Sequence, residues 1–412
     1  MRPILVILTL LTSVGFYNFH DRVPQPMQRA MFMFMVLVCL CVAIAGKRVK
    51  FSESRFPRLP WFIFACMLFI SVFMADFYHQ QPLVASFIAQ STAIFAYLYF
   101  FVLILLNPDP DRLIKYLFYL SAMSLVIYFI NLATYPHNIF GSPILTDTSR
   151  GMPRVPIPTF NVIMLLTFYS INQWTMTHNK KWWWLIGVGF VMVLFSLTRQ
   201  VMAIMGLLCF FQLLQRMSLL KKLVYGCVII SVGYVVVINL PIYKSLKAIS
   251  EAQIDESADK ENVRVRAWRY YAYESNDDIE TFLFGNGTPS LGKTVWGKRF
   301  ESYAEESGEL MVDVSWAGCV FQYGIIGALA LLSIVLCAIF KRKAPGEQYL
   351  TYFMICALLE GIASGVWYYP QEISVIMIAL YLIYGSKSGN NNESLTTISV
   401  SKCIGRRRFV TE

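Results

Sequence analysis

Long apolar runs, separated by short polar turns, repeat along almost the whole chain. A transmembrane helix needs about 20 mostly apolar residues, so the runs predict about twelve such helices. They lie at residues 3–19, 29–46, 60–76, 83–106, 113–133, 156–175, 182–198, 200–215, 221–241, 314–340, 348–367 and 371–385. Because lipid offers the backbone no hydrogen-bond partner, each run must satisfy its own N–H and C=O groups as a helix. The pattern therefore predicts an all-α, polytopic membrane protein.

Two stretches depart from this pattern. Residues 242–313, between the ninth and tenth predicted helices, form the longest polar region of the chain. Residues 386–412 are basic and rich in Ser, Asn and Gly, a composition typical of disordered segments. The predicted organisation is transmembrane helices 1 to 9 in 1–241, a large loop at 242–313, three further transmembrane helices in 314–385 and a disordered basic tail at 386–412.

Lys and Arg residues mark one side of the predicted bundle. The tail is basic, and so are the connections at 47–58, 107–115, 176–181, 216–222 and 341–347. The connections at 77–82 and 368–370, on the other side, contain neither Lys nor Arg. Cytoplasmic loops of membrane proteins carry an excess of Lys and Arg. We therefore expect both termini in the cytoplasm, and the segments 134–155 and 242–313 at the outer face.

The composition supports this picture and excludes other classes of protein. Hydrophobic residues make up 57% of the chain and charged residues 15%, against about 45–50% and about 25% in soluble domains. The net charge of +10 lies mainly in short connections and in the tail, where it sets topology, so we expect no nucleic-acid partner. The nine cysteines lie mostly in apolar runs, lack metal-ligand spacing and are absent from 242–313. We expect neither a metal site nor a disulfide framework.

Arginine on the outer side opposes the positive-inside bias, so its presence there indicates a function. Arg199 lies between two apolar runs with almost no turn between them. Ionisable residues at such depths are costly and mark functional sites by default. We interpret Arg199 as an anchor for an anionic head group; the alternative is a snorkelling side chain that only marks the turn.

A second group of arginines lies in the outer loop, in a stretch from Glu261 to Tyr271 that resembles a short amphipathic helix. Residues four apart share a helix face, so Arg264 and Trp268 lie together, whereas Arg266 points roughly opposite to Arg264. The planar guanidinium group suits two-pronged contacts with phosphate. The alternative is a solvated charged face whose arginines pair with nearby acids, namely Asp259, Glu261 and Glu274.

Two further features follow in the outer loop. Gly285 and Gly287 flank Asn286 in a turn that permits a close approach of the backbone to another group. An acidic run then leads to Asp313, immediately before the next apolar run. Asp313 is interpreted either as an N-cap of that helix or as a catalytic carboxylate.

The order of these features resembles the superfamily of bacterial O-antigen polymerases and O-antigen ligases. The resemblance covers roughly residues 185–330 and, through the layout of the spans, extends loosely to the whole chain. Its motifs are, in order, Thr198-Arg199, Arg264-Val265-Arg266-Ala267-Trp268, Phe284-Gly285-Asn286-Gly287 and Gln322-Tyr323-Gly324-Ile325-Ile326-Gly327. Their order along the chain and their common side are more specific than any one motif.

The resemblance implies a metal-independent glycosyltransferase of the inner membrane that needs no cofactor. Its substrate would be an undecaprenyl-pyrophosphate-linked oligosaccharide, its site would face the periplasm, and a chain-length regulator is an expected partner. Arg199 matches the family's turn arginine, and either Arg264 or Arg266, with Arg266 slightly favoured, matches the arginine ahead of the Gly-x-Gly turn. Arg154 is a weaker match to a further outer arginine.

The predicted site follows from these matches. Its catalytic residues are Arg199, Arg266 and Asp313, and its substrate-binding residues are Arg154, Arg264, Trp268, Gly285 and Gly287. Ligases of the family carry a histidine after the Gly-x-Gly turn, whereas residues 242–313 contain none and hold Asp313 at that place. This departure favours a repeat-unit polymerase, with a ligase as the near alternative. The general base stays open among Asp313, Glu309 and Glu306, with Asp313 first.

A transporter or flippase of lipid-linked sugars is the alternative from another class. Transporters are expected to carry ionisable groups near the midplane and helices broken at Gly or Pro. The predicted spans contain few charges, with Glu360 the main one, and the polar residues gather in one outer loop. This distribution favours chemistry at the membrane surface.

Overall fold

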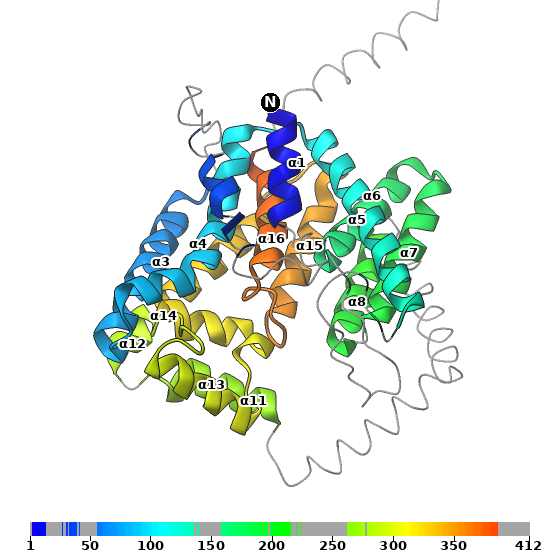
Figure 1. Cartoon of the computed structure of the whole chain (residues 1–412). Coiled ribbons are helices and arrows are strands. Elements are labelled where there is room, and N and C mark those ends of the chain that lie inside the picture. Colours follow the sequence, from blue (N-terminus) through cyan, green and yellow to red (C-terminus); the bar gives the residue numbers. More distant parts are fainter. Residues whose placement is uncertain are drawn as a thin grey trace, which may run out of the picture.

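The computed structural model of the chain describes residues 2–13, 56–135, 159–196, 198–215, 262–276 and 278–385. It also describes residues 27, 30–31, 33–38, 41, 137, 139, 157, 220 and 224. The regular elements in these ranges are all helices (Figure 1). The predicted helices at 29–46 and 221–241, the segment that holds Arg150 and Arg154, and the tail at 386–412 lie wholly or mostly outside the described residues.

The helices form two groups that share one central helix. In the first group α3 packs on α14 and α4 on α16, with α1 against α4 and α16. In the second, α6 contacts α5, α7 and α8. The central helix, α15, contacts α14 and α16 on one side and α6 and α8 on the other. Their bounds are α1 Arg2–Ser13, α3 Arg58–His79, α4 Leu83–Leu106, α5 Pro110–Ala133, α6 Phe160–Thr177, α7 Lys181–Phe195, α8 Arg199–Leu214, α14 Ser315–Phe340, α15 Gln348–Glu360 and α16 Pro370–Tyr384.

Four of the described helices are long and apolar enough to cross a membrane: α3, α4, α5 and α14. Shorter apolar helices occur at Pro3–Ser13, Lys181–Phe195, Gln200–Leu214 and Pro370–Tyr384. Large apolar side chains on these helices, such as Phe73, Phe77 and Trp184, are exposed. Apolar surface of this extent suits lipid rather than water. The chain is therefore an all-helical, membrane-embedded protein in its described part, and twelve spans remain a prediction.

The basic connections gather at one end of the bundle. The hydroxyl of Tyr381 donates to the carbonyl of Pro108 at 2.6 Å, and Lys341 Nζ donates to the carbonyl of Ile383 at 2.7 Å. The amide of Asn172 donates to the carbonyl of Gly346 at 2.8 Å. These contacts bring 107–110 and 341–347 together at the end where α1 begins in Figure 1. The described part of the polar outer loop lies at the opposite end. These connections therefore share one end of the bundle, and the side of the membrane that this end faces stays a prediction.

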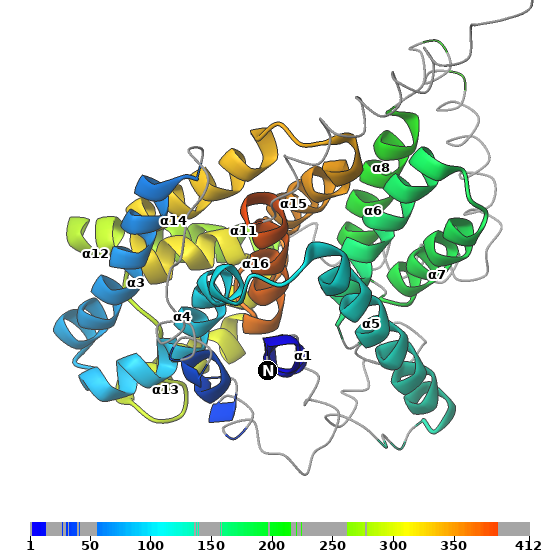
Figure 2. The same ribbon diagram turned by 90° about the horizontal axis from the view of Figure 1, so that it is seen from above.

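Short helices build the described part of the outer loop. They are α11 Val263–Arg269, which continues as a π-turn over Tyr270–Glu274, α12 Ile279–Phe284, α13 Val295–Ser307 and a 3₁₀ turn at Met311–Asp313. Buried Gln81, between α3 and α4, fastens this layer to the bundle. Its side-chain oxygen accepts from the Ser290 N–H at 2.8 Å, and its amide donates to the Thr288 carbonyl at 3.0 Å. Figure 2 shows α12 beside α3 and α14, and Trp296 of α13 stacks on His79 at the end of α3.

One predicted helix ends earlier than expected. The apolar run at 348–367 forms α15 only as far as Glu360, and residues 361–369 then follow an irregular path to α16. The carbonyls of Gly361 and Ser364 accept from the N–H groups of Trp316 and Ser315 at 3.1 and 3.2 Å. The first N–H groups of a helix lack partners within it. Segment 361–369 supplies carbonyl acceptors to the first N–H groups of α14. Hydropathy alone does not reveal this long-range pairing, so it predicts a longer helix.

Candidate functional site

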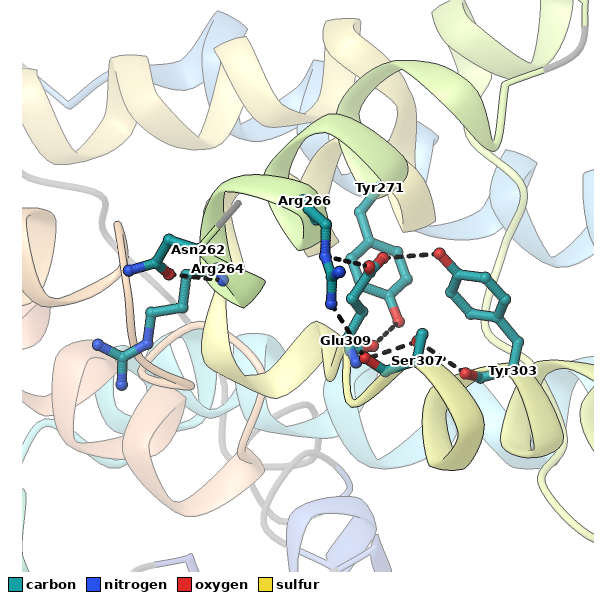
Figure 3. A network of polar contacts seen from close by, with 7 residues as sticks. All are labelled: Asn262, Arg264, Arg266, Tyr271, Tyr303, Ser307 and Glu309. Carbon is teal, nitrogen blue, oxygen red and sulfur yellow. Dashed lines mark hydrogen bonds and ion pairs between the residues drawn. The ribbon is translucent and has the colours of Figure 1, made fainter. Parts of the chain in front are cut away.

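A buried ion pair ties the outer loop together (Figure 3). Arg266 on α11 places Nε 3.0 Å from Oε1 of Glu309, and its side chain is 35% exposed against 8% for the Glu309 side chain. The second oxygen of Glu309 accepts from the hydroxyl of Tyr303 at 2.6 Å. Both carboxylate oxygens therefore have partners, as a buried charge requires. The sequence suggested Asp259, Glu261 and Glu274 as partners of these arginines. Arg266 pairs with Glu309 and not with Glu274, while Asp259 and Glu261 lie outside the described residues.

Backbone contacts extend this network. The hydroxyl of Tyr271 donates to the Glu309 carbonyl at 2.7 Å, and the Glu309 N–H donates to Oγ of Ser307 at 3.1 Å. Burial raises the pKa of Tyr303 and the hydrogen bond to Glu309 raises it further, so this phenol stays a donor. Because four side chains from α11, the π-turn after it and α13 hold one glutamate, the network fixes α11 against α13.

The face of α11 opposite Arg266 carries two other predicted site residues, Arg264 and Trp268. Trp268 donates its indole N–H to the carbonyl of Ile362 at 2.7 Å, which sets this face against segment 361–369. Arg264 is exposed, lies one turn before Trp268 on the same face, and points away from Glu309 in Figure 3. It forms no ion pair with another described residue. The prediction that Arg264 and Arg266 lie on different faces of the helix is confirmed. The two arginines therefore have different surroundings.

Arg199 begins α8 as its first helical residue; its side chain is outside the described part of the structure. The next residue locates this helix end. The side-chain amide of Gln200 donates to the carbonyls of Leu359 and Glu360, both at 3.4 Å. The start of α8 thus lies against the end of α15, immediately beside segment 361–369.

Segment 361–369 joins the predicted motifs, which are far apart in the sequence. Trp268 of α11 contacts Ile362, Gln200 of α8 contacts the preceding turn, and the first N–H groups of α14 bond to this segment. We call this meeting point of α8, α11, α14 and segment 361–369 the junction. Sequence reasoning missed the segment because it lies inside an apolar run. The local signal was Gly361 immediately after the charged Glu360, with a second glycine, Gly365, shortly beyond it.

The Gly-x-Gly turn packs against a break in α14. Gly324 has φ +69° and ψ 172°, so the helix is interrupted there and nearby carbonyls lose their partners within the helix. The N–H groups of Asn286 and Gly287 replace them by donating to Phe321 and Gln322 at 2.7 and 3.2 Å. A Cβ on Gly285 would overlap the carbonyl of Gln322. The close approach predicted for this turn is therefore to α14.

This packing accounts for glycine at both predicted positions of the turn. Gly285 and Gly287 have φ values of +86° and +79°. Glycine reaches this region without the steric cost of a side chain. Both glycines are buried in the protein, and their contact with substrate stays a prediction.

A histidine reaches the same turn from another part of the chain. His79, the last residue of α3, places Nε2 2.9 Å from Oδ1 of Asn286 and stacks on Trp296 with ring centroids 4.0 Å apart. The amide nitrogen of Asn286 donates to Oδ1 of Asn276 at 2.9 Å. The oxygen of Asn286 is thus the acceptor, and Nε2 of His79 is the donor. The lack of histidine in 242–313 did not predict this neighbour, because His79 lies far before the loop in the sequence.

Asp313 does not cap the helix that follows it. It lies in the 3₁₀ turn Met311–Asp313, and the N-cap position of α14 is occupied by Val314 without a side-chain cap. The N-cap interpretation is therefore wrong. The N–H groups that it would have satisfied bond to Gly361 and Ser364. Asp313 is half-buried beside the junction, so its predicted catalytic role stays a prediction.

Two observations complete the description of the site. Arg154 lies outside the described residues. Among the residues that the structure describes, no group of three or more His, Cys, Asp or Glu side chains is placed to hold a metal ion. Comparison of the chain with protein-family models and with curated proteins finds no match.

Proposed function

We propose that this chain is a membrane-embedded glycosyltransferase that polymerises oligosaccharide repeat units. The donor is an undecaprenyl-pyrophosphate-linked oligosaccharide, and the acceptor is a sugar hydroxyl on a second lipid-linked repeat. The single observation that carries the proposal is the junction. It gathers the first turn of α8, the Arg264–Trp268 face of α11 and the start of α14 at the end of the bundle opposite the basic connections.

Arginine supplies the chemistry in this proposal. The pyrophosphate leaving group gains charge as the glycosidic bond breaks, and fixed cations that face it lower the barrier. Arg264 suits this role because it is exposed at the junction and is not engaged by Glu309. Arg199, at the start of α8, is the second arginine of the clamp. Arg266 holds Glu309 and so orients α11, which moves its proposed role from catalysis to positioning.

The proposed orientation in the membrane follows from the positions of the basic connections and the outer loop. Basic connections meet at one end of the bundle and the polar outer loop covers the other. In a bacterial inner membrane the basic end faces the cytoplasm. We therefore place both termini in the cytoplasm and the junction at the periplasmic face, where a lipid-linked donor and a chain-length regulator would have access to it.

A ligase that transfers finished polymer to lipid A-core is a second candidate within the same reaction class. The observation in its favour is His79, which α3 brings to Asn286 in the Gly-x-Gly turn. The resemblance implies a histidine after this turn for a ligase, whereas His79 comes from a helix that precedes the turn in the sequence. The geometry leaves the junction arginines in the same role for either acceptor.

A transporter gains one supporting feature, the break in α14 at Gly324. In transporters, unwound helices offer free carbonyls to ions. Here the carbonyls of Phe321 and Gln322 already accept from Asn286 and Gly287. The break therefore serves the docking of the outer loop, which favours a transferase over a transporter.

The test is a gel of surface polysaccharide from a strain that lacks this chain, stained for sugar. For a polymerase we expect the ladder to collapse to core that bears a single repeat. Loss of the ladder from the core while long lipid-linked chains accumulate would identify a ligase. An unchanged ladder would overturn the proposed function.

A further inference from the structure

Glu360 is a buried carboxyl group that the fold does not explain. It is the last residue of α15, and it is 3% exposed. Its Oε1 lies 3.6 Å from Sγ of Cys356, and it forms no ion pair with any Lys, Arg or His side chain that the structure describes. A buried carboxyl group with so weak a partner is costly to stability. Its position at the junction indicates a function.

Gln200 adds a second acceptor at the same place. Its amide nitrogen donates to the carbonyls of Leu359 and Glu360, so the side chain lies at the end of α15. Its Oε1 is buried and accepts no hydrogen bond from any described group. Buried polar atoms are nearly always hydrogen-bonded, so an acceptor without a donor requires an explanation. The junction therefore holds two under-used acceptors from two different helices.

The chemistry of these acceptors selects their ligand. A carboxylate and an amide oxygen repel a phosphate group and bind a neutral hydrogen-bond donor. A sugar hydroxyl is such a donor, and the α11 arginine that suits the donor pyrophosphate lies on a different element of the junction. Gln200 and Glu360 thus add a pair of acceptors, where α8 meets α15, to the arginines proposed for the pyrophosphate on α11 and at the start of α8.

We propose that Gln200 and Glu360 bind the attacking hydroxyl of the acceptor sugar and that Glu360 is its general base. This inference rests on the proposed function. In the transfer, the hydroxyl oxygen forms a bond to the anomeric carbon, and the bond from that carbon to the pyrophosphate oxygen breaks. The hydroxyl proton goes to the Glu360 carboxylate, and undecaprenyl pyrophosphate leaves with the bonding electron pair.

Asp313, half-buried beside the junction, stays the candidate base that the sequence predicts, whereas two other acids fit the role less well. Glu309 has both carboxylate oxygens engaged by Arg266 and Tyr303, so accepting a proton would break that network. Glu372, in the first turn of α16, lies close enough to Glu360 for their charges to interact. It makes no described contact with α8 or α11 and is only partly buried, which makes it a control for the loss of a neighbouring carboxyl group.

The experiment compares variants of the purified full-length protein in lipid nanodiscs. The substrate is the lipid-linked repeat unit extracted from cells that lack the chain, and elongation is followed on gels. E360Q keeps the shape of the side chain but cannot accept the proton. General bases contribute about 10²–10⁴-fold to rate, so we expect kcat to fall by that factor. The KM for the donor should change by less than about threefold, since the arginines that bind it are intact.

Three further variants separate catalysis from folding. E360D keeps a carboxylate and should recover part of the lost kcat, whereas E372Q should match the wild-type protein. Q200L removes the amide acceptor and should raise the KM for the acceptor by about tenfold, the loss of roughly one hydrogen bond. This variant keeps the inference testable if E360Q does not fold.

The outcomes are distinct. Elongation by folded E360Q at a rate within about threefold of the wild-type rate would overturn the inference while the proposed function stands. An unchanged acceptor KM in Q200L would overturn it as well. A wild-type protein that fails to elongate the repeat unit would instead overturn the proposed function, and the inference with it.

Discussion

Arg264 and Arg266 are two residues apart, yet they meet different environments because they lie on different faces of a helix. Arg266 is paired with Glu309, whose side chain is 8% exposed, whereas Arg264 is exposed beside segment 361–369. The first arrangement stabilises the fold. The second leaves a cation available to a ligand. A single helical turn thus separates an arginine that holds the fold from one for which we propose ligand binding.

Substitution of each arginine by alanine separates these roles. We expect Arg266→Ala to destabilise the protein by about 1–3 kcal/mol, because the carboxylate of Glu309 loses its cation while it stays buried. Arg264→Ala should cost less than about 0.5 kcal/mol, as for an exposed side chain away from any network. Thermal melting of the two variants in detergent measures the difference. Equal loss of stability in both variants would contradict the assignment.

The identity of the motif arginine shows how far residue-level reasoning from the sequence can go. Helical spacing correctly placed Arg264 with Trp268 and away from Arg266, because that relation is local. The partner of Arg266 is Glu309, 43 positions along the chain, and nothing local predicts that contact. The same limit applies to His79 and Asn286, which are 207 positions apart.

At the scale of elements, two backbone segments, one in α14 and one in the outer loop, supply each other's missing hydrogen-bond partners. The break in α14 at Gly324 leaves carbonyls without helical partners, and the Gly-x-Gly turn supplies the missing N–H groups. A side chain on either partner would collide: a Cβ on Gly324 would overlap the Leu283 carbonyl, and one on Gly285 the Gln322 carbonyl. The two motifs form one docking surface between outer loop and bundle.

Alanine at these glycines tests the docking surface. We expect Gly285→Ala and Gly324→Ala to lower stability by more than about 3 kcal/mol, since each combines a left-handed backbone with a collision. Gly308→Ala is the matched control. Gly308 has φ +71°, but a Cβ added to it would meet no other atom within 4 Å. Backbone strain alone, about 1–2 kcal/mol, therefore applies there.

Melting temperature and the yield of folded protein report these differences. If Gly285→Ala were no worse than Gly308→Ala, the turn would not be held against α14, and the docking of the outer loop would need another explanation.

The observed helices also show which structural features could be predicted from the sequence. The amphipathic stretch from Glu261 to Tyr271 does form a helix, α11, because its pattern is local. The apolar run at 348–367 ends as a helix at Glu360, since the carbonyls of segment 361–369 serve α14. The N–H groups of α14 find these carbonyls only because the two elements meet in space, and no local pattern in the sequence shows that meeting. For the same reason Asp313, an acid in the expected capping position, is not a cap.

At the scale of the whole molecule, the bundle has a basic end and an end covered by the polar outer loop. The connections at 107–110 and 341–347 meet at the first, and Gln81 fastens the loop at the second. The two helix groups share α15, whose last turn lies at the junction. A site placed there is reached from one face of the membrane, which is what transfer between lipid-linked substrates requires.

Labelling of single cysteines in intact cells tests this sidedness. Lys298 on α13 and Lys180 before α7 are both exposed and lie at opposite ends of the bundle. In a version without the native cysteines, we expect a membrane-impermeant maleimide to react with Lys298→Cys and not with Lys180→Cys. Breaking the cells open should make both react. Labelling of Lys180→Cys alone in intact cells would reverse the orientation and place the junction in the cytoplasm.

The most direct test of the central claim, that the junction transfers lipid-linked sugar, is a comparison of two arginine variants in living cells. A strain that lacks the chain is supplied with Arg264→Ala or with Arg299→Ala, an exposed arginine on α13 away from the junction. Polysaccharide is then compared on a sugar-stained gel at equal protein level. We predict single repeats with Arg264→Ala and a full ladder with Arg299→Ala. A full ladder with both variants would contradict the account.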